Sequence, residues 1–401
     1  MDPLAGKKIL LMIGGSVSAY KTPELARRLR DRGVELRVAL SRHAADFVAP
    51  LALQAVTGQP VRQSLFSPEE EAAMEHIALA RWADALLYAP VSANGLAGLA
   101  QGLASDLPGT IVLASRAPLF LAPAMNTAMW EHPANQRNVR QLQADGATFL
   151  GPANGELACG ETGAGRLLEV PDIIDELCLA LASKPWAGRQ VLVTAGPTWE
   201  AWDPVRGLSN RASGRQGYAL AQAAAERGAQ VTLVSGPTSL PCPSGVRRIA
   251  VESARDMLAA CQNIVQLQRV DLFIANAAVA DHRPASTVND KQGKGEIPNQ
   301  LALLPNPDIV RSLHESAARP RYLLAFAAET HGDEERAVAK LRAKGADFAV
   351  LNDLRSGAMG GSENAAVLYC SDRRWELPRS DKLDLARALL HHLDSCLHGK
   401  I

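Results

Sequence analysis

The chain has 401 residues, of which 47% are hydrophobic and 21% charged, a composition typical of a globular protein with more than one domain. Its 42 basic residues balance its 42 acidic residues, so net charge predicts neither a nucleic-acid nor a membrane partner. No stretch approaches the roughly 20 apolar residues of a membrane span, and the N-terminus lacks a signal-peptide pattern, so we expect a cytoplasmic location.

Cysteine spacing predicts neither a zinc site nor a disulfide framework. There is no CxxC pair and no cysteine–histidine spacing suited to zinc. In a chain without an export signal, the cysteines are expected to be free thiols. They are Cys159, Cys178, Cys242, Cys261, Cys370 and Cys396.

The first half alternates apolar strands with helices. Strands that are apolar on both faces are typical of a parallel sheet covered by helices on both sides. The expected elements are a strand at 8–13, a helix at 19–31 ended by Gly33, and strands at 35–40, 85–89 and 118–122, followed by a helix at about 172–181.

The pattern stops at residues 183–188 and then begins again, which predicts a linker between domains at 1–183 and 188–401. We therefore predict an α/β protein with two three-layer Rossmann-like domains and mainly parallel sheets. In the second half we expect a Pro/Gly/Lys-rich loop at about 283–298, a helix at 218–227 ended by Gly228, and strands at 190–195, 231–234, 271–275, 322–327 and 347–351.

Three strand ends in the first half have features of a phosphate site. Gly14-Gly15-Ser16 opens a helix, Ser41 follows a strand, and Pro90-Val91-Ser92-Ala93-Asn94-Gly95 opens another helix. Helix N-termini and hydroxyl groups favour anions. A tight strand–helix turn explains the glycines equally well, and the absence of GxGxxG argues against a dinucleotide-dependent dehydrogenase.

Two further segments of the first half have distinctive sequence motifs. Residues 123–130 read PAMNTAMW, and residues 158–166 read ACGETGAGR in a loop that could close as a flap. With the phosphate loops, they resemble the homo-oligomeric flavin-containing cysteine decarboxylases over residues 6–182. The resemblance implies a flavodoxin-like first domain, a trimer-based assembly, and FMN bound between subunits. The implied cofactor-binding residues are Gly15, Ser16, Ser41, Ser92 and Asn94.

The same resemblance implies the catalytic groups. His76 would be the base, Asn126 would hold the substrate carboxylate, and Cys159 would donate a proton to the enethiolate left by CO2 loss. Met129 would contact substrate. Without the motifs, these positions would suggest an exposed helix histidine, a turn asparagine and a structural cysteine. Where the family usually has a second glycine the chain has Ser16, which would be strained if that position required positive φ.

The second half is similar to the phosphopantothenate–cysteine ligase domain fused behind this decarboxylase in many bacteria. The matching segments, within residues 188–395, are 194–198, 203–206, 208–210, 276–281, 306–309 and 326–330. The resemblance implies a dimeric domain that uses CTP and Mg2+ to convert 4′-phosphopantothenate into an acyl-cytidylate, from which the amine of cysteine displaces CMP. The whole chain is thus similar to the bifunctional enzymes of coenzyme A biosynthesis.

The ligase resemblance also implies site residues. Asn210 would assist the second half-reaction, Arg206 would order the site, and Asp281 would contact nucleotide or its metal. The remaining implied substrate or nucleotide contacts are Ala277, Lys291, Phe326, Lys340 and Lys344. A solvated surface charge is the alternative for each single lysine or arginine.

Several positions depart from the ligase pattern and leave other readings open. They are Trp199, Gly207, Ala212, Arg215 and Gly293. One alternative is a decarboxylase whose second half is degenerate and serves assembly or binding. Another is a non-enzymatic regulatory flavoprotein, against which the joint presence of His76, Asn126 and Cys159 argues.

Overall fold

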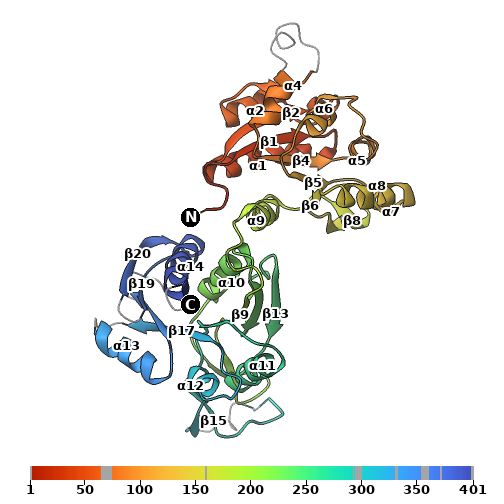
Figure 1. Ribbon diagram of the computed structural model, residues 1–401. Helices are drawn as coiled ribbons and strands as arrows, with labels where there is room; N and C mark the ends of the chain where they lie inside the picture. Colours follow the sequence, from red (N-terminus) through yellow and green to blue (C-terminus); the bar gives the residue numbers. More distant parts are fainter. Residues whose placement is uncertain are drawn as a thin grey trace. The chain divides into compact units, whose positions relative to one another are not determined.

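The structure, a computed structural model, describes residues 2–64, 75–158, 160–291, 293, 300–329, 333–353, 361–370 and 373–398. The chain divides into two compact units, residues 2–181 (the first unit) and residues 182–401 (the second unit). Each unit is an α/β structure around its own sheet (Figure 1).

The first unit contains a six-stranded parallel sheet with the order β3-β2-β1-β4-β5-β6. Its strands are β1 (Lys8–Ile13), β2 (Glu35–Leu40), β3 (Val61–Arg62), β4 (Ala85–Val91), β5 (Leu119–Pro123) and β6 (Thr148–Phe149). A separate antiparallel hairpin pairs β7 (Ala153–Glu156) with β8 (Thr162–Arg166), and we call residues 153–166 the flap.

Helices cover both faces of this sheet. Successive residues of β1 point to opposite faces, with Ile9, Leu11 and Ile13 in one buried cluster and Leu10 and Met12 in the other. This explains why the strand is apolar at every position. The helices are η1 (Val17–Lys21), α1 (Thr22–Asp31), η2 (Ala44–Asp46), α2 (Pro50–Thr57), α4 (Glu75–Trp82), α5 (Ala93–Ala100), α6 (Leu107–Ala114), α7 (Thr127–Glu131), α8 (Pro133–Ala144) and α9 (Val170–Leu181).

The second unit repeats this strand order and extends it. Its sheet runs β13-β12-β9-β14-β17-β18-β19-β20, parallel from β13 to β18 and antiparallel from β18 to β20. These strands are β9 (Gln190–Ala195), β12 (Gln230–Ser235), β13 (Val246–Ala250), β14 (Leu272–Ala275), β17 (Tyr322–Glu329), β18 (Phe348–Asp353), β19 (Glu363–Cys370) and β20 (Arg373–Asp381).

Two short antiparallel pairs and five helices complete the described part of the second unit. The pairs are β10 (Trp199–Ala201) with β11 (Gly207–Ser209), and β15 (His282–Pro284) with β16 (Leu303–Pro305). The helices are α10 (Arg215–Glu226), α11 (Ala254–Leu267), α12 (Ile309–His314), α13 (Glu334–Ala343) and α14 (Lys382–His398).

The predicted α/β class with mainly parallel sheets is confirmed. Three details differ from the predictions. The helix expected at 19–31 is a 3-10 turn followed by α1, the loop expected at 283–298 begins within β15, and the hairpin of β19 and β20 was not expected.

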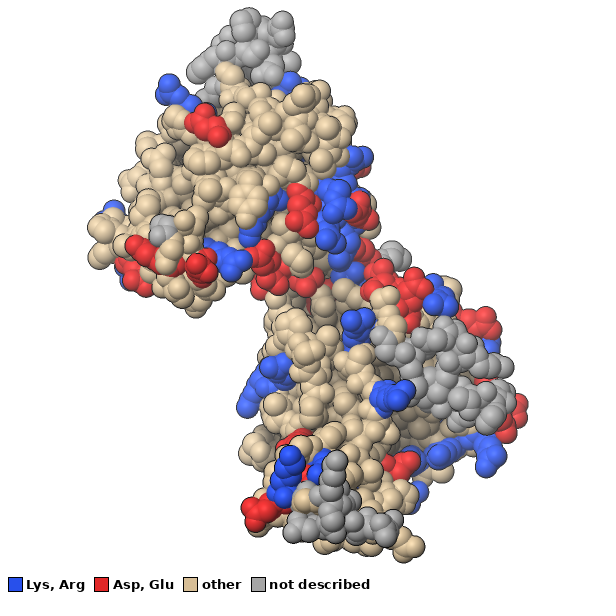
Figure 2. Space-filling view, turned by 180° about the vertical axis from the view of Figure 1, so that it is seen from behind, with Lys and Arg blue, Asp and Glu red and all other residues tan. Residues whose placement is uncertain are grey.

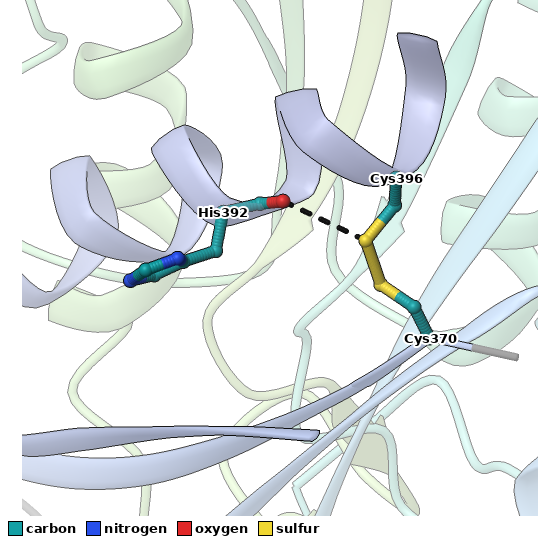
Figure 3. The surroundings of a disulfide bond; sticks show 3 residues. All are labelled: Cys370, His392 and Cys396. Atoms are coloured by element: carbon teal, nitrogen blue, oxygen red, sulfur yellow. Dashed lines mark hydrogen bonds between the residues drawn. A yellow bond between two sulfur atoms is a disulfide. The ribbon is translucent and has the colours of Figure 1, made fainter. Parts of the chain in front are cut away.

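The prediction that all cysteines are free thiols is wrong for one pair. Cys370, at the end of β19, and Cys396, in α14, form a disulfide with their Cα atoms 6.6 Å apart (Figure 3). The Sγ atom of Cys396 also lies 3.6 Å from the carbonyl oxygen of His392. Because the pairing depends on how α14 packs on the sheet, no local spacing could indicate it.

Among the described residues, the cysteines outside the disulfide are Cys178, Cys242 and Cys261. Burial raises the pKa of Cys261 to about 12, so this thiol stays protonated at neutral pH. Cys178 is also buried, whereas Cys242 is exposed. These cysteines fit the expected packing and surface roles.

Surface charge agrees with the balanced composition. Basic and acidic side chains lie intermingled on the face shown in Figure 2. Among the described residues, the helices are all too short or too polar to cross a bilayer.

Candidate functional site

The strand order places a crevice between β1 and β4 of the first unit, because the connections leave these neighbouring strands in opposite directions. The Gly14-Gly15 loop follows β1 and lies close to its neighbours. A Cβ atom on Gly14 would be 2.7 Å from the carbonyl oxygen of Pro90, and one on Gly15 would be 2.9 Å from Cβ of His43. Only glycine fits this approach, so the loop packs closely against the segments after β2 and β4.

Ser16 is not strained. Its φ of −146° and ψ of 147° are those of extended backbone, and its hydroxyl lies 3.4 Å from the carbonyl oxygen of Ala124, to which it donates. Serine therefore fits this position, and the departure from the family pattern does not disturb the loop.

The expected cofactor hydroxyls gather at the same edge of the sheet. Ser41 follows β2 and hydrogen-bonds Tyr88, whose pKa burial raises well above its usual range. The Oγ of Ser92 accepts from the backbone N–H of Gly95 at 3.3 Å and caps α5, and Asn94 is exposed in the first turn of that helix. This edge thus offers hydroxyls and a helix N-terminus to an anion.

A cavity of about 520 Å3 opens beside this edge. It is lined by Ser16, Val17, Ser18, Tyr20, Lys21, Met125, Asn126, Glu156, Leu157, Ala158, Gly165 and Arg166. The cavity thus lies between the loop after β1, the loop after β5 and the flap.

Asn126 has a defined orientation in this cavity. Its Oδ1 atom accepts from the backbone N–H of Ala128 at 2.8 Å and caps α7, and its Nδ2 atom donates to Oε2 of Glu161 at 2.6 Å. Met129, on α7, is half exposed. The amide of Asn126 therefore directs its donor toward the flap.

The flap lies directly against the loop that carries Asn126. The backbone N–H of Met125 donates to the carbonyl oxygen of Gly165 at 2.9 Å. Gly165 has a φ of +132°, and a Cβ atom there would be 2.4 Å from the carbonyl oxygen of Met125. Cys159, the expected proton donor, belongs to the flap by sequence but lies outside the described residues.

A small charge cluster borders the cavity. Nζ of Lys21 lies 2.9 Å from Oε2 of Glu169, and Arg166 pairs with the same carboxylate. The hydrogen bond from Lys21 lowers the pKa of Glu169, which stays ionised. The sequence analysis did not single out Lys21 or Glu161. Glu161 is part of the flap motif, whereas no spacing marks Lys21.

His76 is the second residue of α4 and is half buried. Because α4 ends just before β4 begins, its first turn lies toward the carboxyl ends of the strands. His76 is not among the residues that line the cavity. Its expected role as a base therefore stays a prediction.

The second unit has its own crevice between β9 and β14. The loop after β14 is fixed to the loop after β9, since the N–H of Ala278 donates to the carbonyl oxygen of Gly196 at 2.9 Å. Asn210 joins them, because its Nδ2 atom donates to the carbonyl oxygens of Ala278 at 3.2 Å and Val279 at 3.0 Å. Ala277 lies in the same loop, with its N–H 3.4 Å from Oγ1 of Thr194.

Arg206 lies in the turn between β10 and β11. The buried carboxylate of Asp203 accepts from the backbone N–H groups of Val205 at 2.8 Å and Arg206 at 2.7 Å. The guanidinium of Arg206 is 3.7 Å from Oδ2 of Asp203. Asp203, which the sequence analysis did not assign to the site, therefore orders the turn that carries Arg206.

Two departures from the ligase pattern compensate each other. A Cβ atom on Gly207 would be only 2.6 Å from Cε2 of Trp199, because β10 and β11 are paired here. The indole of Trp199 thus fills the space that a side chain at position 207 would need. Trp199 and Gly207 therefore fit together across the hairpin.

The remaining expected ligase residues are more dispersed. Asp281 and Lys291 are exposed, and Phe326 is half buried on β17. Lys340 lies exposed in the last turn of α13, at the far end of that helix from the carboxyl end of β17. The described geometry therefore joins Asn210 to Ala277 but does not place Lys340 beside them.

Lys344 is engaged in an ion pair, with Nζ 2.8 Å from Oδ2 of Asp308. Burial alone would raise the pKa of Asp308, but the hydrogen bond from Lys344 and one from the backbone N–H of Arg311 lower it overall. Among the described residues, the histidine, cysteine and acidic side chains form no group of three or more suited to a metal. Asp281 would need oxygen ligands from a substrate to hold Mg2+.

The chain matches two family models that together cover most of its length. Residues 2–181 match the Flavoprotein family, and residues 186–397 match the DNA/pantothenate metabolism flavoprotein C-terminal domain. A solved C-terminal domain of coenzyme A biosynthesis bifunctional protein CoaBC is 39% identical, covers 54% of this chain and 100% of its own, and has a TM-score of 0.46.

Full-length relatives extend this match. Coenzyme A biosynthesis bifunctional protein CoaBC of Vibrio vulnificus (strain CMCP6) is 43% identical over 99% of this chain and 100% of its own length. The protein of that name from Escherichia coli (strain K12) is 43% identical over 97% of both chains. The chain therefore belongs to the family of bifunctional coenzyme A biosynthesis proteins, with a flavoprotein domain followed by a pantothenate-metabolism domain.

Proposed function

We propose that the second unit ligates 4′-phosphopantothenate to cysteine with CTP and that the first unit decarboxylates the product to 4′-phosphopantetheine. In this proposal the decarboxylase domain is 1–183, the linker 183–188 and the ligase domain 188–401. The observation that supports it is that Asn126 lines a cavity beside the first sheet, while Asn210 bonds the loop after β14 of the second sheet. Two separate crevices suit two separate reactions.

The first crevice fits a flavin phosphate. Gly14 and Gly15 let the loop after β1 pack closely on its neighbours, and Ser16, Ser41, Ser92 and Asn94 supply polar groups at this edge of the sheet. When bound, FMN supplies a two-electron acceptor and donor for the carbon–sulfur group of the substrate. The residues named here would hold its phosphate and orient it.

The chain's own side chains carry the other steps of decarboxylation. Asn126 holds the substrate carboxylate through Nδ2, with Met129 beside it, and His76 accepts a proton from the substrate. Cys159 then returns a proton to the enethiolate carbon after CO2 has left. A thiol with a pKa near its usual value of ~8.5 is protonated at neutral pH and can serve as this donor.

Ligation begins with activation of a carboxylate, which is a poor electrophile. Its oxygen attacks the α-phosphorus of CTP, releases pyrophosphate and forms the acyl-cytidylate. The amine of cysteine then attacks the acyl carbon and CMP leaves. Asn210 supplies a donor at the reacting centre and Arg206 orders the turn beside it. Ala277, Lys291, Phe326, Lys340 and Lys344 would surround the nucleotide.

Mg2+ would bind between the triphosphate and Asp281, since this ion uses few carboxylates together with substrate phosphates. The resemblance to the decarboxylase and ligase families also supports a homo-oligomer, trimer-based in the first unit and dimeric in the second, in the cytoplasm. The compensation between Trp199 and Gly207 favours a working ligase over a degenerate one.

The two activities should separate by mutation. Asn126→Asp places a negative charge where the substrate carboxylate binds, so decarboxylation of supplied phosphopantothenoylcysteine should fall at least about a hundredfold. CMP release from phosphopantothenate, cysteine and CTP should be retained.

Asn210→Asp is the matched variant in the other unit. It should abolish CMP release and leave decarboxylation intact, as followed by chromatography of nucleotides and by CO2 release. Loss of both activities in either variant, with folding retained, would contradict the assignment of one reaction to each unit.

A further inference from the structure

Glu161 occupies the donor that the substrate carboxylate is expected to use. Nδ2 of Asn126 lies 2.6 Å from Oε2 of Glu161, a short hydrogen bond to a carboxylate. The orientation of the amide is fixed independently, because its Oδ1 atom already accepts from the N–H of Ala128 at 2.8 Å. The nitrogen of Asn126 therefore faces an acidic group in the free protein.

Backbone geometry holds the two side chains together. β8 lies against residues 125–127 through Gly165, whose carbonyl oxygen accepts from Met125 at 2.9 Å, and through Gly163. A Cβ atom on Gly163 would be 2.6 Å from Oγ1 of Thr127. The backbone of Glu161 is also held to the other side of the flap, since its carbonyl oxygen accepts from the N–H of Leu157 at 2.8 Å. The placement of β8 thus brings the backbones of Asn126 and Glu161 close enough for their side chains to form the hydrogen bond.

A substrate carboxylate that binds Nδ2 of Asn126 would lie beside the carboxylate of Glu161. The NH2 group has two N–H donors, but two like charges at one amide repel each other, which favours the departure of Glu161 when the substrate binds. Glu161 is exposed, so water can solvate its carboxylate when it leaves Asn126. Exchange of one carboxylate for another therefore needs only a side-chain rotation.

We propose that Glu161 acts as a carboxylate placeholder: it occupies the Nδ2 donor of Asn126 in the free enzyme and is displaced by the substrate carboxylate. This inference rests on the proposed decarboxylase function. It adds that the decarboxylated product, which has no carboxylate, leaves Glu161 in place on Asn126.

The test compares two phosphorylated ligands on the FMN-loaded full-length protein. One is 4′-phosphopantothenoylserine, which keeps the carboxylate but has no thiol to oxidise; the other is the product, 4′-phosphopantetheine. Glu161→Gln and Glu161→Ala should lower the Kd of the serine analogue by roughly three- to tenfold, measured by calorimetry. The Kd of 4′-phosphopantetheine should stay within about twofold.

Glu156→Gln is the matched control. Glu156 lies on the other strand of the flap and lines the same cavity. Removing its charge should change the Kd of both phosphorylated ligands by the same factor. An equal change for both ligands in the Glu161 variants would show a general charge effect and overturn the proposal.

Kinetics give a second readout. Because Glu161 is displaced during binding, Glu161→Gln should lower KM for phosphopantothenoylcysteine and keep kcat within about threefold of the wild-type value. A large loss of kcat at unchanged KM would assign Glu161 to the chemistry and contradict the placeholder role. The proposed function is tested separately: it fails if the wild-type protein does not decarboxylate the substrate. The Kd values of the serine analogue test only the role of Glu161.

Discussion

Gly165 sets how closely the flap approaches Asn126. Its φ of +132° is a region that other residues rarely adopt, and its hydrogen atoms face a backbone carbonyl where a methyl group would not fit. Backbone cannot move aside as a flexible side chain can. The cavity beside Asn126 therefore depends on this residue.

Gly165→Ala should displace β8 from the Met125 loop and lower the rate of decarboxylation by about tenfold or more. Ligation, measured as CMP release, should be unchanged because Gly165 belongs to the other unit.

The control is Gly160→Ala in the same flap. Gly160 also has positive φ, at +83°, but a Cβ atom there would meet nothing within 4 Å. It should cost less activity than Gly165→Ala. Equal losses would show that backbone conformation, and not crowding against Met125, is what matters.

At the scale of residues, the PAMN and ACGE motifs drew attention to Asn126 and to the flap. They did not indicate the hydrogen bond between Asn126 and Glu161, which depends on strand placement. Gly207 departs from the ligase pattern, and the structure shows why glycine fits there: the indole of Trp199, across the hairpin, fills the space that a side chain would need. Sequence order alone does not reveal such a pair.

Helix α14 packs on α10 through a buried ion pair. The guanidinium of Arg387 donates from Nε and NH2 to the two oxygens of Glu226, each at 2.8 Å, and both side chains are at most 5% exposed. A bidentate pair removed from water is costly to break, because the remaining charge stays buried.

Arg387→Met should lower the free energy of unfolding of the second unit by ~3–5 kcal/mol, since it leaves Glu226 buried without this partner. The double variant Arg387→Met/Glu226→Met should recover most of that loss. Calorimetry of the full chain would resolve the affected transition.

Arg379→Met provides the matched control. Arg379 pairs with Glu363 at 2.8 Å, but both side chains are more than half exposed. Its loss should cost less than ~1 kcal/mol. An equal loss in the Arg379 and Arg387 variants would contradict the importance of burial.

At the scale of elements, the parallel strands were the easiest to predict. β1, β9 and their neighbours are apolar at nearly every position because both sheet faces are covered. The antiparallel β19 instead alternates buried and partly exposed residues, a weaker signal, and it was missed together with the disulfide from Cys370 to Cys396.

The molecule as a whole repeats one architecture twice. In each unit the first strand of the sheet lies at the centre, with the second and third strands to one side and the fourth and later parallel strands to the other. Each unit therefore has a crevice of its own, with Asn126 at the cavity of the first unit and Asn210 on the loop after β14 of the second. The second sheet differs by its antiparallel extension through β19 and β20.

This repetition could be predicted because a pattern of strands and helices stops and restarts near residue 185. The positions of Lys340 and Lys344 could not be predicted from the sequence, because the spacing of a single lysine does not indicate what its side chain contacts. Lys344 is engaged with Asp308, a contact between α13 and the start of α12.

The most direct test of the account is mass spectrometry of the products that the purified full-length protein makes from 4′-phosphopantothenate, cysteine, CTP and Mg2+. We expect 4′-phosphopantetheine and CMP, which would require both units to act in sequence. Failure to form CMP, while supplied phosphopantothenoylcysteine is still converted to 4′-phosphopantetheine, would contradict the ligase function of the second unit.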